Sequence, residues 1–298
     1  MFFSIIIPTY NRAHLICKTL TSVFNQTIKD FEVIIVDDGS SDNTGEVVRE
    51  FIKQNNLTNF YYYFKENAER AAARNYGIER SKGQWVTFLD SDDLLYKNHL
   101  ELAENFIYSN PKTLVFHSAY EFRDENNQLL KKVTYPSNSD LNKIILKGNF
   151  LSCFGMFIKK EILSNLKFNE HRNLSGTEDW LLWLQLASRY PVKLQPIITG
   201  KMIQHSGRSV MSFDENELIK RKEILINSLC DDDVFISKFG LFSVKQIEGH
   251  MLTYLAIHLI LMKNKKSGLY YFFNGIKKNK KEFFTFRTLA IFKHLLFS

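Results

Sequence analysis

Acidic and hydroxyl side chains gather directly after three apolar, strand-length runs of the chain. The clusters are Pro8-Thr9-Tyr10-Asn11-Arg12, Asp37-Asp38-Gly39-Ser40-Ser41-Asp42 and Asp90-Ser91-Asp92-Asp93. Carboxylates that are crowded together repel one another unless a cation or hydrogen-bond donors neutralise them. A hard divalent cation such as Mg²⁺ or Mn²⁺ takes oxygen ligands and bridges protein carboxylates to a diphosphate. The third cluster therefore indicates a metal-assisted site for a phosphorylated substrate.

Both acidic clusters also have a simpler interpretation as helix caps. Ser91-Asp92-Asp93 would cap a helix near 97–108, and Gly39-Ser40 would form the turn and cap before a helix near 43–54. Two adjacent acids, Asp37-Asp38, are more than a cap requires, so we expect side chains here that accept hydrogen bonds from a ligand. The occurrence of both clusters makes a shared site the better interpretation.

The elements that must position these clusters alternate regularly over residues 2–110, where apolar residues recur with strand or helix periods. The expected strands are 4–7, 32–36, 60–64 and 85–89, and the expected helices are near 13–25, 43–54, 68–81 and 97–108. This alternation predicts a parallel sheet covered on both faces. Ligands of such sheets bind beyond the carboxyl ends of the strands, so the clusters should converge.

The rest of the chain is less regular. Further strands are expected at 114–117, 153–158 and 192–203, with a polar turn at 121–128. A helix should begin after Thr177 as its N-cap and continue to about Arg189. From about residue 214 onward the pattern is helical and increasingly amphipathic.

Composition sets limits on the class of protein. The chain has 298 residues, 45% hydrophobic and 24% charged, which is globular usage and excludes a disulfide-stapled mini-protein. Its cysteines, Cys17, Cys153 and Cys230, are widely spaced, which indicates a reducing compartment and no cysteine metal site. The first residues form a strand-like run without the features of a signal peptide, so we expect a cytoplasmic location.

The net charge of +7 belongs to the C-terminal tail, because residues 263–298 hold nine lysines and arginines against the single acid Glu282. Aromatic residues interleave with these lysines, whereas Leu252–Met262 is too short to span a bilayer. The tail suits an anionic membrane surface, which would place the protein at its inner face. Packing of a helical subdomain that leaves lysines in water is the alternative, and nucleic-acid binding is the least favoured.

Five motifs resemble, in order, those of the inverting GT-A glycosyltransferases of family 2, over about residues 1–210. They are Pro8-Thr9-Tyr10-Asn11-Arg12, Val36-Asp37-Asp38-Gly39-Ser40, Ala73-Arg74-Asn75-x-Gly77, Phe88-Leu89-Asp90-Ser91-Asp92-Asp93 and Glu178-Asp179. The resemblance implies an α/β GT-A fold with a mainly parallel central sheet, flanking helices and a helical C-terminal extension. It divides the chain into a catalytic domain at 1–213 (nucleotide-binding half about 1–110, acceptor half about 111–213) and a basic aromatic region at 214–298.

The resemblance also implies roles for individual residues. The donor nucleotide would be bound by Pro8, Thr9, Tyr10, Arg12, Asp38, Arg74, Asp90, Ser91 and Asp92. Mn²⁺ or Mg²⁺ would be held by Asp92 or Asp93, with Asp92 first, and by His205, for which a solvated loop histidine is the alternative. The neighbouring Arg208 and Ser209 would contact phosphate.

Asp179 resembles the catalytic base of the family, with Glu178 and Trp180 on the acceptor side. Inverting transfer needs a carboxylate that deprotonates the acceptor hydroxyl as it attacks, and the first turn of a helix favours the ionised form. A capping role is the alternative for the acidic pair. Trp180 and Trp183 suit the hydrophobic core better than a sugar-stacking platform.

Together these roles predict a metal-dependent inverting glycosyltransferase. It would move a sugar from a nucleotide-diphosphate sugar, a UDP-sugar by resemblance, to a saccharide or lipid-linked acceptor in cell-surface polysaccharide synthesis. One alternative is a nucleotidyltransferase that makes a sugar nucleotide, whose glycine-rich first loop is not matched by Thr9–Arg12. Another is a non-catalytic nucleotide-sugar-binding protein. Dinucleotide and Walker motifs are missing, which disfavours a dehydrogenase or a P-loop ATPase.

Overall fold

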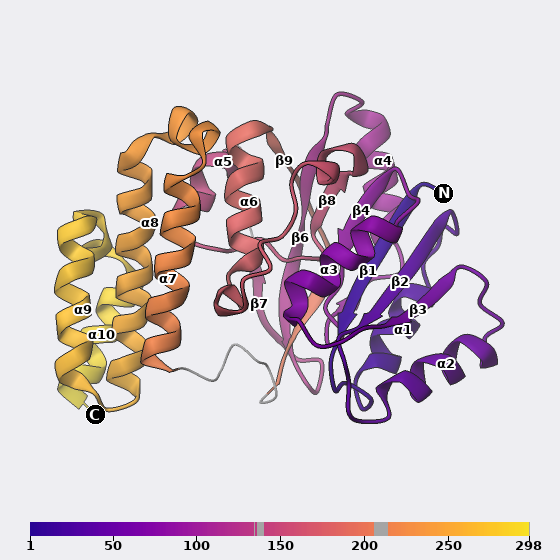
Figure 1. Cartoon of the computed structure of the whole chain (residues 1–298), viewed down its shortest axis with the longest axis horizontal. Coiled ribbons are helices and arrows are strands. Elements are labelled where there is room, and N and C mark those ends of the chain that lie inside the picture. The colour runs from indigo at the N-terminus through magenta and orange to yellow at the C-terminus, as the bar shows by residue number, and fades with distance from the viewer. Residues whose placement is uncertain (134, 136–139, 206–213, 298) are drawn as a thin grey trace.

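A computed structural model describes residues 1–133, 135, 140–205 and 214–297, and it contains one twisted sheet with helices on its faces and further helices to one side (Figure 1). The strands are β1 (Phe3–Thr9), β2 (Phe31–Asp37), β3 (Phe60–Phe64), β4 (Trp85–Phe88), β5 (Leu94–Leu95), β6 (Val115–Asp124), β7 (Leu129–Val133), β8 (Met156–Lys159) and β9 (Val192–Gln204). The helices are α1 (Ile16–Phe24), α2 (Thr44–Gln54), α3 (Glu69–Arg80), α4 (His99–Ser109), α5 (Leu141–Ile144), α6 (Glu178–Arg189), α7 (Glu215–Cys230), α8 (Asp233–Leu261), α9 (Lys265–Lys278) and α10 (Phe286–Phe297). Short 3-10 helices are η1 (Ile145–Lys147), η2 (Lys160–Ser164), η3 (Arg172–Leu174) and η5 (Lys280–Phe284).

The N-terminal half of the sheet is parallel in the order β3-β2-β1-β4, as the strand–helix alternation predicts. Ile6 lies in register with Ile34 on one side and Phe88 on the other. Every residue of β1 and β2 is buried, which requires helices on both faces of this sheet. The strands and helices expected over residues 2–110 are confirmed, with shifts of a few residues at their ends.

The other half of the sheet is mixed. β8 runs antiparallel to β4 and β6, while β6 is parallel to β9 and antiparallel to β7. The polar turn expected at 121–128 is wrong in its first part, because β6 continues through Asp124. Glu121 is 3% exposed there, and hydrogen bonds from Tyr96 and Arg123 satisfy its carboxylate. A buried, paired acid cannot be distinguished from a turn residue by composition alone.

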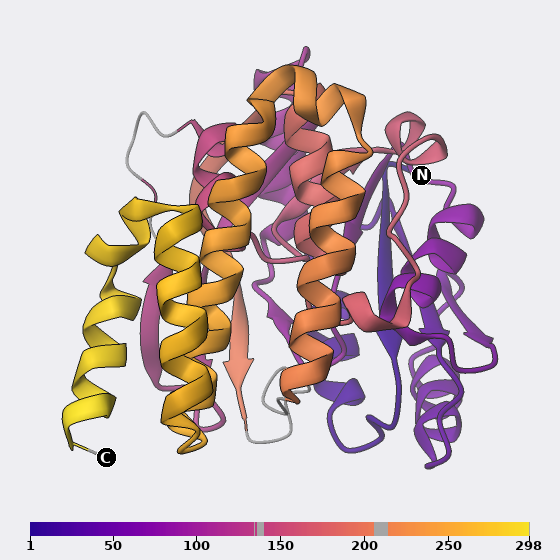
Figure 2. The ribbon, with the colours of Figure 1, turned by 60° about the vertical axis from the view of Figure 1, so that its left-hand side comes forward.

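The C-terminal helices pack against the sheet domain through α8, which lies against α6 (Figure 2). Phe235, Val244 and Ile247 of α8 belong to the same buried cluster as Leu181 and Leu184 of α6. Gly240 interrupts α8 with a φ of +75°, which changes the direction of the helix. Within the described ranges, no helix is both long and apolar enough to cross a membrane.

Candidate functional site

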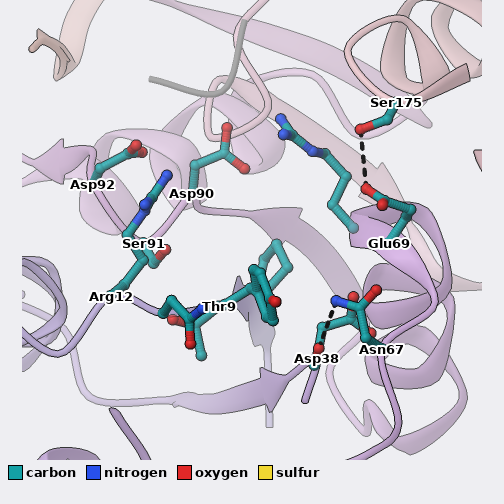
Figure 3. A pocket seen from close by; sticks show the side chains of 13 residues that line it. Thr9, Arg12, Asp38, Asn67, Glu69, Asp90, Ser91, Asp92 and Ser175 are labelled. Atoms are coloured by element: carbon teal, nitrogen blue, oxygen red, sulfur yellow. Dashed lines mark hydrogen bonds between the residues drawn. The ribbon is translucent and has the colours of Figure 1, made fainter. Parts of the chain in front are cut away.

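A cavity of about 570 Å³ opens at the carboxyl ends of β1, β2 and β4 (Figure 3). Eight of the nine residues predicted for the donor nucleotide line this donor cavity: Pro8, Thr9, Tyr10, Arg12, Asp38, Asp90, Ser91 and Asp92. The lining residues to which the sequence assigned no donor role are Asn11, Asn67, Glu69, Arg70 and Ser175. The convergence expected from a parallel sheet therefore brings the three polar clusters together.

The adjacent acids Asp37 and Asp38 have different environments. Asp37 holds the turn, because its carboxylate accepts hydrogen bonds from the Ser40 N–H at 2.8 Å and the Tyr62 hydroxyl at 2.7 Å. Asp38 borders the donor cavity, and its Oδ1 accepts from the Lys65 Nζ at 2.7 Å and a backbone N–H at 3.0 Å. Asp37 is therefore engaged in the turn, and Asp38 is the acid of the pair that borders the cavity.

Two residues that line the cavity have left-handed backbone conformations that few non-glycine residues adopt. Asn11 has a φ of +51° and Glu69 a φ of +73°. The Asn11 side chain accepts from the Ser41 N–H at 2.8 Å, and Ser175 donates to Glu69 at 3.1 Å (Figure 3). Such conformations cluster at functional sites. An asparagine directly after a strand is a signal that could have identified Asn11, whereas nothing local marks Glu69.

In the acidic loop after β4, the adjacent residues Asp92 and Asp93 have different partners. The Oδ2 of Asp92 lies 3.1 Å from Nε2 of His205. Asp93 is 1% exposed and turns inward, where its Oδ1 accepts the backbone N–H of Ile203 at 3.1 Å. The helix that follows begins after Asn98, so the loop does not cap it. The predicted phosphate contacts Arg208 and Ser209 lie outside the described residues.

The side chains of Asp92 and His205 carry an oxygen and an imidazole nitrogen that a divalent cation accepts as ligands. Mg²⁺ in proteins is commonly held by one or two carboxylates and completed by water and substrate phosphates, and imidazole is acceptable to Mn²⁺. No group of three or more His, Cys, Asp or Glu residues able to hold a metal occurs in the described ranges. These two ligands therefore suit a metal whose coordination is completed by a diphosphate better than a site in which protein side chains supply every ligand.

Arg74, the ninth predicted donor residue, lies behind the donor cavity rather than in its lining. Its side chain is 1% exposed, and its guanidinium donates to Asp90 Oδ1 and to Glu178 Oε1, each at 2.7 Å. Burial raises the pKa of Glu178, but the guanidinium groups of Arg70 and Arg74 outweigh this and hold the pKa below its ordinary value. Arg74 thereby joins the acidic loop to the first turn of α6.

Asp179 stands in the first turn of α6, where the predicted helix start after Thr177 is confirmed. Its Oδ2 accepts from Asn149 Nδ2 at 3.0 Å, and its Oδ1 accepts from the Trp180 backbone N–H at 2.7 Å. Burial raises the pKa of Asp179 to about 6, and the Glu178 carboxylate adds to this shift while Arg74 opposes it. A carboxylate with a pKa near neutrality is suited to accept a proton.

A second cavity, of about 350 Å³, is lined by Asp179 and bordered by Glu178, Trp180 and the C-terminal helices. Arg70 and Asp90 line both cavities, so the two are adjacent. Trp180 is 3% exposed, and its indole N–H donates to the Ile145 carbonyl at 2.9 Å. Most of this ring therefore packs in the core.

Sequence comparison matches this chain to glycosyltransferases. A family model described as Glycosyl transferase family 2 matches residues 4–167. An uncharacterized glycosyltransferase of Rickettsia felis is 31% identical over 290 residues, which cover 96% of this chain and 46% of that protein. The Escherichia coli protein UDP-Glc:alpha-D-GlcNAc-diphosphoundecaprenol beta-1,3-glucosyltransferase WfgD is 34% identical over 188 residues, which cover 61% of this chain and 68% of that protein.

The fold is shared with a solved structure. The crystal structure of S. aureus TarS 1-349 in complex with UDP matches with a TM-score of 0.62 at 18% sequence identity, covering 100% of this chain and 92% of that chain. At this identity the likeness shows a common fold. The chain spans about half the length, 46%, of the Rickettsia relatives that it matches along nearly all of its own length.

Proposed function

The chain belongs to glycosyl transferase family 2, and from this premise we propose that it transfers a sugar from a UDP-sugar to a hydroxyl of a saccharide or lipid-linked acceptor. The observation that carries the proposal is that Asp179 lines a cavity that shares Arg70 and Asp90 with the donor cavity, where the predicted donor residues lie. The name of the E. coli relative supports a UDP-sugar and a lipid-linked acceptor.

The donor cavity would hold the nucleotide diphosphate through its polar loops. Tyr10 is 48% exposed, so its ring is available to stack on a base, while Asp38 would accept hydrogen bonds from it. Asp92 and His205 would hold Mn²⁺ or Mg²⁺, which neutralises the charge that develops on the leaving diphosphate. Arg74 acts from behind this site by fixing the orientation of the Asp90 carboxylate.

The transfer step needs one proton acceptor and no covalent enzyme intermediate. The acceptor oxygen forms a bond to the anomeric carbon as the bond from that carbon to the diphosphate oxygen breaks, and UDP leaves with the bonding electrons. Asp179 takes the proton of the attacking hydroxyl. Attack from the side opposite the leaving group inverts the anomeric configuration.

The C-terminal helices would bring the enzyme to an anionic membrane surface on its cytoplasmic side, in cell-surface polysaccharide synthesis. Phe284 is 86% and Phe286 90% exposed, and both follow the basic pair Lys280 and Lys281 in η5. Exposed aromatic rings beside lysines match the interface of an anionic bilayer. In co-sedimentation, vesicles with phosphatidylglycerol should retain the protein, and Phe284→Ser should weaken retention more than Phe64→Ser, an exposed aromatic residue at the end of β3. Equal retention by neutral vesicles would contradict this role.

Calorimetric titration with UDP, with and without Mn²⁺, tests the donor site. We expect binding that Mn²⁺ strengthens and that Asp92→Ala and His205→Ala make insensitive to the metal. Lys201→Ala, on β9 outside the donor cavity, is the control. If neither UDP nor GDP binds the unmodified protein in the presence of Mn²⁺, the proposed function is wrong.

A further inference from the structure

The second cavity is built jointly by the α/β domain and the C-terminal helices. The α/β domain contributes the loop and first turn of α6, with Gly176 and Asp179, and the C-terminal helices contribute Arg221 of α7 and Tyr254 of α8. A ligand here would be able to contact both the carboxylate of Asp179 and the α7 helix. The C-terminal helices therefore do more than support the fold, because they supply part of a binding surface.

Cationic side chains outnumber carboxylates among the described residues of this cavity. The cations are Arg70, Arg74, Arg221, Lys222 and Arg287, and the carboxylates are Asp90, Glu178 and Asp179. The charge of Arg74 is compensated by Asp90 and Glu178, and Arg287 lies 3.7 Å from Glu282. Burial, with Arg287 nearby, lowers the pKa of His250 to about 3, so this imidazole is uncharged. Arg70 lies 3.8 Å from Glu178, so Arg221 and Lys222 of α7 are the lining cations for which the described residues provide no ion pair.

The positively charged side chain of Arg221 lines the cavity. Its Nε is buried and has no hydrogen-bond partner among the described residues. A Cβ added at Gly176 would lie 3.4 Å from Arg221 Nη1, so the guanidinium faces the loop three residues before Asp179. Burial lowers the pKa of Arg221, an effect that Tyr254 and Glu178 oppose. Burial without a hydrogen-bond partner leaves this guanidinium poorly solvated, and an oxyanion bound to its Nη groups in the cavity would compensate for the lost hydration.

The chemistry of this group selects the class of ligand. A guanidinium presents parallel N–H donors that match two oxygens of a phosphate, and such charge-assisted pairs are stronger than neutral hydrogen bonds. A cavity of this volume is large enough for a small-molecule group. Lys222, the next residue on α7 and also in the lining, adds a second positive charge on the same side.

We propose that this cavity binds a phosphate group of the acceptor, held by Arg221 with Lys222 beside it, so that the acceptor hydroxyl lies against Asp179. This inference rests on the proposed function and adds the acceptor class and the residues that recognise it. The phosphate can belong to a lipid diphosphate that carries the acceptor sugar or to a polyol-phosphate chain.

Calorimetric titration in the presence of UDP and Mn²⁺ tests the assignment with three probes. They are an N-acetylglucosamine diphosphoryl farnesyl lipid, a short ribitol-phosphate oligomer, and octyl N-acetylglucosaminide as the neutral analogue. Arg221→Gln removes the charge and Arg221→Lys keeps it without the planar fork. Lys220→Gln is the matched control, because Lys220 is exposed on the same helix and does not line the cavity.

We expect a phosphate probe to bind more tightly than the neutral one, and Arg221→Gln to weaken it about tenfold or more, with a smaller loss for Arg221→Lys. Lys220→Gln should leave its affinity unchanged. The phosphate probe that binds identifies the source. The assignment is overturned if neither phosphate probe exceeds the neutral one, or if Arg221→Gln and Lys220→Gln behave alike. UDP affinity is measured for each variant, so failure of UDP to bind at all refutes the proposed function separately.

Discussion

Replacing Arg74 with methionine should destabilise the protein strongly, because this buried guanidinium neutralises two carboxylates that lie 16 and 104 residues away in the sequence. Asp90 is 25% exposed and can be rehydrated, but Glu178 is 2% exposed and would remain as a buried charge. Removing one partner of a buried ion pair costs about 3–5 kcal/mol. Arg70, 3.8 Å from Glu178, offsets part of this, so we expect a loss of about 3 kcal/mol.

Urea unfolding of Arg74→Met measures this loss as a change in the free energy of unfolding. Lys167→Met is the matched control, since Lys167 pairs with Glu79 at 2.8 Å but both side chains are largely exposed, and such pairs contribute about 0–1 kcal/mol. Adding Glu178→Gln to Arg74→Met removes the stranded charge and should restore part of the stability. If Arg74→Met costs no more than Lys167→Met, or if Glu178→Gln brings no recovery, the electrostatic reasoning is refuted.

Three further outcomes follow from the site geometry. Asp179→Asn should slow sugar transfer by about 10²–10⁴-fold without changing UDP affinity. The transfer rate of the unmodified protein should rise about tenfold from pH 5 to pH 7, because a base with a pKa of about 6 must be deprotonated. A flat pH profile would exclude Asp179 as the base. Gly39→Ala should lower the free energy of unfolding in urea by about 1–2 kcal/mol and weaken UDP binding. Gly39 has a φ of +83°, and an added Cβ would lie 2.9 Å from the backbone nitrogen of Asn67. An unchanged free energy of unfolding would argue against this strain. Asp93→Ala should cost about 1–3 kcal/mol in the free energy of unfolding, because it removes the carboxylate that accepts the backbone N–H of Ile203, whereas Asp92→Ala should leave that free energy nearly unchanged. Equal losses would show that both acids are structural.

The N-terminal half of the fold follows from local patterns in the sequence. Apolar runs ending in Pro8, Asp37 and Asp90 mark strands whose carboxyl ends share one edge of a parallel sheet, and the structure brings these ends together around the donor cavity. Hydrophobic periodicity reports which face of an element is buried, and that is enough to place residues at strand ends. For the same reason the start of α6 after Thr177 was predictable.

Other features depend on contacts that local patterns do not encode. The sequence alone left Asp92 and Asp93 as alternative metal ligands, and only the packing of β9 against the acidic loop separates them: Ile203 donates to Asp93, and His205 lies beside Asp92. Likewise, composition predicts a turn at Glu121, because the burial of this residue depends on Tyr96 from a distant segment.

The sequence by itself determined the α/β class, the order of the motifs and eight of the thirteen residues that line the donor cavity, because short-range periodicity and the residues at strand ends carry this information. The tertiary structure alone decided that Arg74 bridges the acidic loop to Glu178, and that Arg221 of α7 faces the loop before Asp179. These contacts join segments far apart in the chain, and they arise from how the helices pack on the sheet. Such packing is a property of the whole core, which no local pattern specifies.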